Sequence, residues 1–419
     1  MNPTARITEI RARWSAAVRA LRSLDRSARM PRLLDAPSQA GDPAACMRAQ
    51  RVVVVGLGSV GLAISDLLSR ASVAWLLLVD RAQIKPESVL THPVQPCDIG
   101  CDKATLAGQR AKAVSPNTRV QVFSGPVAEL PPDAFVGASA VFLSSDNLAC
   151  ELEVSQRCLQ LGLPLIQASV HGPTLVAQVR SLANAAGGDG PCLACGYQAS
   201  DWEALDRGTV FSCTGGPARW NGIPTVSPAH LCSLAASLAV TELLGRSAGL
   251  VPASESRLIE YCGFQHRTVV TPLLRRAECQ RDHGRWQVVP WARRLATATP
   301  RELLAAAGCT DPQALAQVSL TVPGFRFRGL GMCACTRHPV IERFQRIGAE
   351  SAPCTDCGSP LDFHPLYTHA QVPGIALRAQ LDRSLGQLGA DAADAVLVRR
   401  HDEVFLFHAR KLPVPANSR

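Results

Sequence analysis

Short apolar runs alternate with helical segments between residues 51 and 168. The helical segments carry apolar residues at three- and four-residue steps, whereas the runs are apolar throughout, as strands buried on both faces are. The runs cover residues 52–55, 74–79, 140–143 and 164–168, and the helical segments cover residues 60–69, 103–114 and 147–161. This alternation predicts a doubly wound α/β domain with a mostly parallel sheet.

The pattern changes on both sides of this domain. Residues 1–50 have apolar residues at helical spacing and predict a helical arm that ends in a loop reaching Gln50. After Leu175 the pattern predicts a hairpin, then an irregular loop, a helix, two strands, a second helix and a strand-like tail. From the loop onward these elements cover residues 184–228, 229–244, 257–261, 266–270, about 300–318 and 395–408. An irregular loop of this length inside a compact domain indicates a functional segment.

These changes divide the chain into three predicted domains. The N-terminal arm covers residues 1–50, and the α/β domain covers residues 51–284 with its crossover loop at about 198–228. A C-terminal extension covers residues 285–419 and contains a cysteine-bearing module at about 325–369, followed by a small tail.

Composition excludes several classes of protein. The 16 cysteines among 419 residues are too sparse for a secreted disulfide scaffold. The formal net charge is +9, but the basic residues are scattered, and with 11 Phe and 3 Tyr the chain lacks the basic, aromatic stripe of a nucleic-acid-binding surface. No stretch approaches the roughly 18 apolar residues of a membrane span, and the N-terminus lacks the apolar core of a signal peptide. We therefore expect a cytoplasmic protein with no membrane or nucleic-acid partner.

A glycine-rich turn follows the first predicted strand. Gly56, Gly58 and Gly61 connect that strand to a helix, and they allow phosphate oxygens to approach backbone N–H groups at the helix N-terminus. Asp80 closes the next strand, where a carboxylate can accept both ribose hydroxyls. The combination predicts a nucleotide site.

The second half of the domain indicates a triphosphate. Only four of the 43 basic residues are lysine, and one of them, Lys103, opens a predicted helix beside the nucleotide site, where it can neutralise phosphate charge. Asp146 and Asn147 follow a predicted strand, and a carboxylate there can hold Mg²⁺. A hydride-transfer enzyme needs neither group.

Two sets of potential metal ligands have the spacing of structural zinc sites. The first combines a C-x-x-C pair with a later Cys and His, and the second combines a C-x-C with a C-x-x-C pair, in which His338 or His364 is an alternative ligand. The two sets are Cys192, Cys195, Cys279 and His283, and Cys333, Cys335, Cys354 and Cys357. All ligands in each set come from the protein, which is typical of structural sites.

Over roughly residues 29–283 these motifs together resemble the ThiF/MoeB-type adenylyltransferases that activate ubiquitin-like proteins. The resemblance implies a Rossmann-like adenylation domain that uses ATP and Mg²⁺. The family's reaction is attack of a ubiquitin-like protein's C-terminal glycine carboxylate on the α-phosphorus of ATP, which gives an acyl-adenylate and pyrophosphate. The chain is also similar in style to the activating enzymes of bacterial ubiquitin-like conjugation operons.

The resemblance assigns roles to individual residues. It implies that Asp80 binds ribose, that Lys103 neutralises phosphate charge and that Asp146 holds Mg²⁺. Arg32, in an R-x-x-R segment, would reach the active site of the partner subunit in a homodimer. The other residues that it implies in nucleotide binding are Gly56, Gly58, Ser59, Gly61 and Asn147.

One departure concerns the phosphate contacts. The places where the family carries an Asn and an Arg hold Ser88 and Thr91, and losing that arginine removes a charge-assisted contact. His92 and Arg110 lie nearby in the sequence, and the sequence does not decide whether either substitutes.

Cys213 lies in the crossover loop, where family members with a catalytic cysteine carry it. A thiolate on such a loop can convert the acyl-adenylate to a thioester for transfer to a conjugating enzyme. Cys232 and Cys262 lie in apolar contexts and are expected in the core. Glu151 and Glu153 are expected on a solvated helix face.

Other functions stay open. A sulfur-carrier adenylyltransferase would use the same fold to prepare a thiocarboxylate. A non-catalytic scaffold of the same fold would bind a partner but would not catalyse ATP–pyrophosphate exchange. A nicotinamide-dependent oxidoreductase is the remaining alternative.

Overall fold

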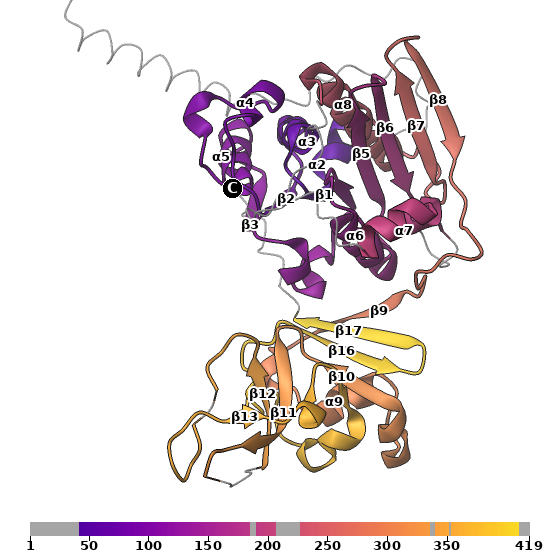
Figure 1. The fold of residues 1–419 in the computed structure, drawn as a ribbon. Coiled ribbons are helices and arrows are strands. Elements are labelled where there is room, and N and C mark those ends of the chain that lie inside the picture. The colour runs from indigo at the N-terminus through magenta and orange to yellow at the C-terminus, as the bar shows by residue number, and fades with distance from the viewer. Residues whose placement is uncertain (1–41, 185–189, 207–226, 336–339, 352, 410–419) are drawn as a thin grey trace, which may run out of the picture. The chain divides into compact units, whose positions relative to one another are not determined.

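The computed structural model describes residues 42–184, 190–206, 227–335, 340–351 and 353–409 (Figure 1). These form two compact units: the first comprises residues up to 127, 137–155 and 163–280, and the second comprises the remainder.

Most of the predicted arm lies outside the described residues. A short helix, α2 (Pro43–Arg48), occupies part of the predicted loop, with the Asp42 side chain accepting the N–H of Ala44 as its N-cap. Within the described residues, no helix has the length and apolar character needed to cross a bilayer.

An eight-stranded sheet forms the centre of the first unit, in the order β3-β2-β1-β4-β5-β6-β7-β8. Strands β3 through β5 pair in parallel, and β6, β7 and β8 continue the sheet in antiparallel pairs. The predicted mostly parallel α/β fold is therefore confirmed. The strands are β1 (Arg51–Val55), β2 (Trp75–Asp80), β3 (Arg119–Ser124), β4 (Ala140–Leu143), β5 (Leu165–His171), β6 (Val176–Leu182), β7 (Arg257–Cys262) and β8 (Arg267–Pro272).

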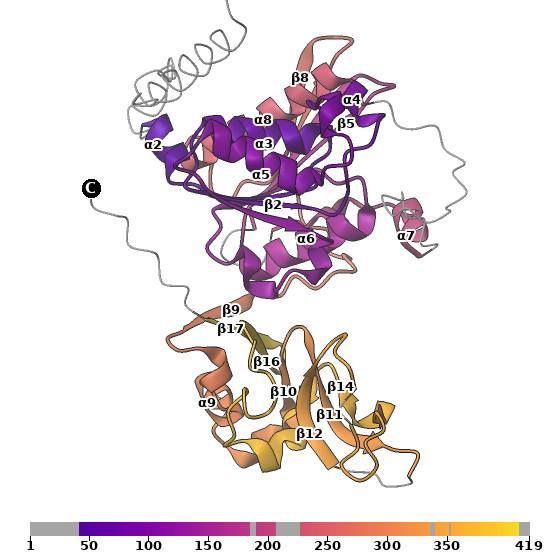
Figure 2. The same cartoon turned by 90° about the vertical axis from the view of Figure 1, so that its left-hand side faces the viewer.

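Helices cover both faces of this sheet. Figure 2 shows α3 (Ser59–Arg70), α5 (Lys103–Val114) and α8 (Ala229–Ser247) on one face, and the first half of α6 (Leu148–Leu161) on the other. The strands read as continuous apolar runs because both faces are buried: β4 is buried along its whole length. Helix α8 packs against α3 as well as the sheet, which buries Cys232 as expected. Shorter helices are α4 (Ser88–Thr91), η2 (Pro96–Asp98), η3 (Val127–Glu129), η4 (Pro132–Phe135), η5 (Leu193–Gly196) and α7 (Ala199–Asp206).

The strand order places the switch point of the sheet between β1 and β4. The chain leaves β1 to build β2 and β3 on one side, and later enters β4 and β5 on the other side. In open α/β sheets the ligand crevice lies outside the carboxyl ends of the strands at such a point. Here these ends are Val55 and Leu143, which are paired in register.

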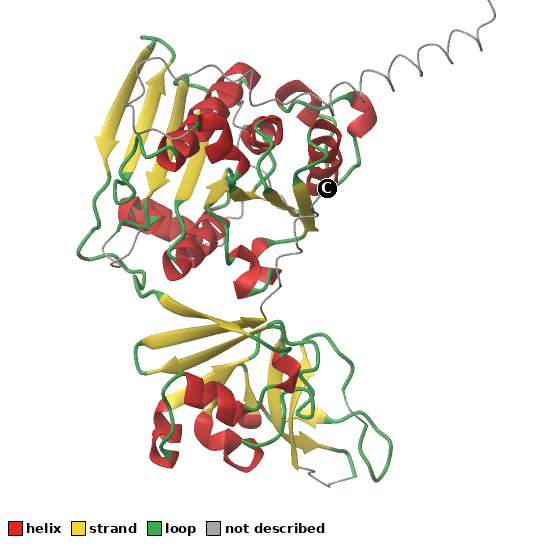
Figure 3. Cartoon of the chain, turned by 180° about the vertical axis from the view of Figure 1, so that it is seen from behind, coloured by secondary structure: helices red, strands yellow, loops and turns green. Residues whose placement is uncertain are grey.

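The second unit contains two smaller sheets (Figure 3). It has a hydrophobic core of its own. One has the order β15-β10-β16-β17-β9; in the other, β11 pairs with β12, β13 and β14. Phe327 and Phe344 meet edge-to-face in this core. The elements are β9 (Trp286–Trp291), η6 (Leu295–Thr297), α9 (Pro300–Ala306), η7 (Pro312–Gln317), β10 (Val318–Thr321), β11 (Phe325–Met332), β12 (Val340–Arg346), β13 (Asp362–Phe363), η8 (Pro365–Tyr367), β14 (Thr368–His369), β15 (Val372–Pro373), η9 (Gly374–Gln380), β16 (Ala395–Arg400) and β17 (Glu403–Ala409).

Two sequence-based boundaries were wrong in this unit. The helix predicted at about 300–318 ends after one capped segment, α9, because Gly308 adopts a φ of +76° and turns the chain out of the helix. The tail predicted as one strand at 395–408 is a hairpin of β16 and β17, with His401 at a φ of +51° in the turn. Apolar alternation alone did not reveal either break.

Candidate functional site

The glycine turn leads from β1 to α3 at the switch point. Gly56 has a φ of +82°, and a Cβ there would lie 2.9 Å from the backbone of Ser144, just after β4. The Ser144 hydroxyl donates to the Gly56 carbonyl at 2.7 Å. A Cβ on Gly61 would lie 2.0 Å from the same carbonyl, so both positions require glycine.

Gly58, the N-cap of α3, is open by contrast: its nearest neighbour is His92 Nε2, 4.0 Å from a Cβ placed there. A phosphate oxygen can therefore approach the backbone at Gly58.

Asp80 lies at the end of β2 and holds the turn. Its Oδ2 accepts the N–H of Leu57 at 2.6 Å, and its Oδ1 accepts the N–H of Ala82 at 2.7 Å. Each carboxylate oxygen has a further acceptor site, so Asp80 can brace the turn and still accept a ribose hydroxyl. The ribose role itself stays a prediction.

Lys103 is the first residue of α5, and its ammonium group meets the histidine that sequence reasoning left without a role. Lys103 Nζ lies 3.3 Å from His92 Nε2. The other ring nitrogen, His92 Nδ1, lies 3.1 Å from the hydroxyl of Ser59, the first residue of α3, and 2.8 Å from the hydroxyl of Thr91. His92 thus connects Lys103 to the helix that follows the glycine turn.

The surroundings of His92 keep its imidazole neutral. Burial and the positive charge of Lys103 together lower the pKa of His92 to about 4, although Glu87 opposes the shift. A neutral imidazole can accept one hydrogen bond while donating another, whereas an imidazolium can only donate.

Ser88 and Thr91 occupy the positions where the family carries an Asn and an Arg, and neither supplies a positive charge. Ser88 is buried, and its hydroxyl accepts the N–H of Lys85 at 3.2 Å. Arg110 is also engaged elsewhere: it pairs with Asp98 at 2.6 Å and donates to the Pro93 carbonyl. Arg110 therefore braces the loop after His92 rather than substituting for the missing arginine.

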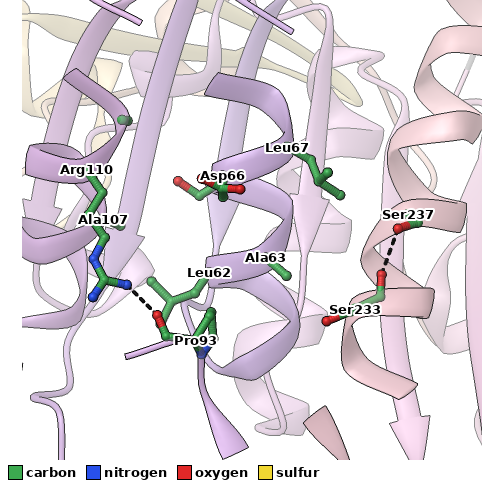
Figure 4. Close-up of a pocket in the computed structure, with 11 residues that line it drawn as sticks. Leu62, Ala63, Asp66, Leu67, Pro93, Ala107, Arg110, Ser233 and Ser237 are labelled. Carbon is green, nitrogen blue, oxygen red and sulfur yellow. Dashed lines mark hydrogen bonds between the residues drawn. The ribbon is translucent and has the colours of Figure 1, made fainter. Parts of the chain in front are cut away.

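Arg110 and Pro93 line a hollow of about 360 Å³ on the outer side of α3, α5 and α8 (Figure 4). Its lining includes Leu62 and Asp66 of α3 and Ser233 of α8, but none of the predicted nucleotide-binding residues. The hollow and the predicted nucleotide site are therefore different places.

Asp146 and Asn147 lie between β4 and α6, at the carboxyl edge of the sheet. Asp146 is exposed, whereas Asn147 has a structural role: its Oδ1 accepts the N–H of Cys150 at 3.0 Å and caps α6. An exposed carboxylate at this edge suits Mg²⁺, which prefers oxygen ligands and retains several waters.

The expectation of a solvated Glu151 was wrong. Glu151 is half-buried in the first turn of α6, and the Tyr197 hydroxyl donates to its carboxylate at 3.1 Å. Burial raises the pKa of Glu151 to about 7, although the Tyr197 hydrogen bond and Arg180 oppose the shift. The 3.0 Å hydrogen bond from the Leu193 N–H to the Ser155 hydroxyl makes a second link. The segment around the C-x-x-C pair is thus fastened to the helix that begins beside Asp146.

The structure brings the predicted metal ligands into the two predicted groups of four. In each group all ligand atoms lie within 4.8 Å of one another: Cys192, Cys195, Cys279 and His283 form the first, and Cys333, Cys335, Cys354 and Cys357 form the second. His364 is not a member, since its Nδ1 accepts the N–H of Leu366, and His338 lies outside the described residues.

The sulfur separations fit tetrahedral zinc. Four thiolates at about 2.3 Å from a zinc ion are about 3.8 Å from one another. The Sγ of Cys192 lies 3.8 Å from that of Cys195 and 3.7 Å from that of Cys279, and Cys335 and Cys354 are also separated by 3.8 Å. Cys333 and Cys357 are closer, at 3.2 Å. Both groups suit a structural zinc ion.

Two predicted functional residues, Arg32 and Cys213, lie outside the described residues. Among the described cysteines that belong to neither metal group, Cys97 and Cys101 are exposed, and Cys262 is only partly buried.

Comparisons with known proteins agree with this architecture. The model of the ThiF family matches residues 37–281, more than half of the chain. The chain belongs to the ThiF family. This confirms the resemblance to ThiF/MoeB-type adenylyltransferases inferred from the motifs.

Curated relatives match shorter segments. SUMO-activating enzyme subunit 1 of Mus musculus is 28% identical over 127 residues, which are 30% of this chain and 36% of the relative. Sulfur carrier protein ThiS adenylyltransferase of Escherichia coli K12 is 27% identical over a match that covers 29% of this chain and 49% of the relative. Sulfur carrier protein adenylyltransferase of Thermus thermophilus is 27% identical over a match that covers 46% of this chain and 69% of the relative. The chain thus spans about a third to two thirds of these relatives.

Solved structures of Escherichia coli MccB are similar at low identity. MccB with ATP has a TM-score of 0.46 and 16% identity, covering 58% of this chain and 70% of MccB.

We predict that Gly61→Ala disrupts the turn. The added Cβ would overlap the Gly56 carbonyl, so the variant should lose about 1–3 kcal/mol of unfolding free energy, measured by urea denaturation. Gly196→Ala is the control, because a Cβ at Gly196 meets no atom within 4 Å. Equal stability of Gly61→Ala and wild type would contradict the prediction.

We predict that neutral His92 makes stability depend on pH. Between its ordinary value of 6.5 and its folded value of about 4, the unfolded chain binds a proton at this histidine that the folded chain does not. The free energy of unfolding should therefore fall as pH drops from 6.5 towards 4. The fall should be smaller in His92→Gln, which cannot titrate. Identical pH dependence of the two proteins would show that the pKa of His92 is not lowered.

We predict two zinc ions per chain by elemental analysis of the purified protein. Cys279→Ser and Cys354→Ser should each reduce the content to one, since each variant removes a thiolate from a different group. Cys309→Ser, outside both groups, should retain two. A wild-type chain with fewer than two, or loss of both ions in either variant, would contradict independent sites.

Proposed function

We propose that this protein is an ATP-dependent adenylyltransferase that activates the C-terminal glycine carboxylate of a ubiquitin-like or sulfur-carrier protein. One observation carries the proposal: at the switch point of the sheet, the open backbone of Gly58 and the ammonium of Lys103 both lie next to His92. That combination of helix N-terminus and cation suits a polyphosphate. The ThiF family match over residues 37–281 supports the same reaction class.

The proposed reaction exchanges one bond at phosphorus. A carboxylate oxygen of the partner attacks the α-phosphorus of ATP, the bond from that phosphorus to the bridging oxygen breaks, and pyrophosphate leaves with the electron pair. Lys103 stabilises the negative charge that develops on the phosphates. Asp80 orients the ribose, and Asp146 would hold Mg²⁺, which supplies further charge neutralisation when bound.

The zinc groups have a structural role in this proposal. The first group holds the segment that Tyr197 and Leu193 fasten to α6, and α6 begins directly after Asp146 and Asn147. Metal binding there would keep the edge of the nucleotide site in place. No ligand position is left open for a reactant, since four protein ligands complete a tetrahedron.

The finer proposal is that Cys213 accepts the activated partner as a thioester. Its thiolate attacks the carbonyl carbon of the acyl-adenylate, the carbon–oxygen bond to the phosphate breaks, and AMP leaves. The thioester then passes to a conjugating enzyme that the extension from residue 285 recruits. The name of one relative, SUMO-activating enzyme subunit 1, supports this version. The proposal includes a cytoplasmic homodimer in which Arg32 reaches the partner subunit's site.

A sulfur-carrier version of the function is equally supported. Two of the curated relatives are adenylyltransferases of sulfur carrier proteins. In this version sulfide attacks the carbonyl carbon of the acyl-adenylate, the carbon–oxygen bond to the phosphate breaks, AMP leaves, and the product is a thiocarboxylate. Cys213 then has no role as an acceptor.

The decisive measurement is ATP–pyrophosphate exchange by the full chain with Mg²⁺ and each small β-grasp protein encoded beside its gene. We expect exchange to require one such partner, because its carboxylate is the nucleophile. Lys103→Ala should lower the rate by about a hundredfold through loss of charge stabilisation. Lys112→Ala, on the same helix but exposed in its last turn, should match wild type. Tight partner binding without exchange would instead establish a non-catalytic scaffold.

Intact-mass analysis of the same mixtures separates the two versions. A thioester predicts an adduct of chain and partner that a reducing thiol releases and that Cys213→Ala abolishes. Cys97→Ala and Cys101→Ala should retain the adduct, and they control for reaction at the exposed cysteines near Lys103. Exchange without any adduct, followed by thiocarboxylate formation when sulfide is added, would favour the sulfur-carrier version.

A further inference from the structure

His92 contacts both walls of the proposed phosphate site. One wall is the start of α3, where the Ser59 hydroxyl lies 3.1 Å from His92 Nδ1. The other is the start of α5, where Lys103 Nζ lies 3.3 Å from His92 Nε2. These helices are separated by more than thirty residues of sequence. A single imidazole ring therefore contacts the first residues of both helices.

The contacts determine which ring nitrogen carries the proton. The Lys103 ammonium has only hydrogens to offer, so His92 Nε2 must accept and cannot be protonated. The proton of the neutral ring is therefore on Nδ1, which donates to the hydroxyl of Ser59 or Thr91. The ring acts as an acceptor towards the lysine and as a donor towards the pair of hydroxyls, of which Ser59 belongs to α3.

The ring also lies close to Gly58, the open position of the glycine turn. A Cβ on Gly58 would lie 4.0 Å from His92 Nε2, the same atom that accepts from Lys103. The ammonium is thus held next to the backbone that is free to receive a phosphate. Lysine has a long flexible side chain with four rotatable bonds, and without a partner its ammonium would sample many positions.

A neutral acceptor is the appropriate partner for a lysine that must attract phosphate. A carboxylate at this position would hold the ammonium equally well, but it would cancel the positive charge and repel the phosphates. An imidazole without charge leaves the full charge of Lys103 available. Because the ammonium has three hydrogens, it can keep its hydrogen bond to His92 Nε2 and still donate to a phosphate oxyanion.

We propose that His92 is a positioning residue of the nucleotide site, which orders Lys103 and Ser59 around the glycine turn for the phosphates of ATP. The inference rests on the proposed function, since it assumes that ATP binds at this turn. The inference also fits the presence of Thr91 at the position of the family's arginine. The protein orders the cation of α5, Lys103, and supplies no second cation from position 91.

The test is the dissociation constant for Mg²⁺-ATP and for adenosine, measured by calorimetry on the full chain. The variants are His92→Leu, His92→Gln, Lys103→Met and the double variant His92→Leu/Lys103→Met. His92→Leu should weaken ATP binding by about tenfold, because it removes the partner of a charged group, and should leave adenosine binding unchanged. His92→Gln, whose carbonyl oxygen can accept from Lys103, should recover most of the affinity for ATP.

The double variant tests whether His92 acts through Lys103. If it does, His92→Leu should have little further effect once Lys103 is methionine. Equal ATP affinity of His92→Leu and wild type would overturn the inference, and so would the full tenfold effect in the Lys103→Met background. Equal weakening of ATP and adenosine would also overturn it, because that is the result of a general structural defect.

The same data distinguish failure of this inference from failure of the proposed function. If the wild type binds ATP no more tightly than adenosine, the phosphate site itself is wrong and both proposals fail. If the wild type prefers ATP and Lys103→Met loses that preference while His92→Leu keeps it, only the role of His92 fails. Unfolding midpoints of each variant, measured alongside, identify any that do not fold.

Discussion

The close approach of the glycine turn to the end of β4 is the constraint on which the nucleotide site depends. Gly56 meets the backbone of Ser144, and Gly61 meets the carbonyl of Gly56, at separations that leave no room for a Cβ. The contact holds α3 tightly against the sheet, and it brings the N-terminus of α3 to the carboxyl edge where Asp80 and Asp146 also lie. A wider turn would move the helix dipole away from both carboxylates.

The remaining parts of the site are held by connections from further away in the sequence. His92 joins the start of α5 to the start of α3, and Tyr197 joins the metal-binding segment to the first turn of α6. Both connections use side chains with altered titration: burial lowers the pKa of His92 and raises that of Glu151, the acceptor for Tyr197. Between pH 4.5 and 6.5 both groups are therefore mostly uncharged in the folded chain, whereas with their ordinary pKa values both would be largely or partly charged.

The metal groups illustrate how few residues can stabilise irregular backbone. The first group gathers ligands from positions 192 to 283, which flank the crossover segment, α8 and the last two strands of the sheet, β7 and β8. The second gathers ligands after β11 and β12, where the surrounding strands are short and the apolar cluster is small. A bound metal ion would supply there, through four protein ligands, what a larger hydrophobic core supplies elsewhere.

The sequence by itself determined those features of the structure that depend on residues close together in the chain. Apolar runs marked the central strands, since these are buried on both faces. Gly56 and Gly61 marked the turn, since no larger residue fits at either position. Ligand spacing marked the metal groups because a C-x-x-C pair forms one side of a tetrahedron without help from the rest of the fold. Only the tertiary structure decided the roles of His92 and Glu151, because hydrogen bonding and burial depend on residues distant in the chain. For the same reason Arg110, close to the site in sequence, turned out to be bound to Asp98.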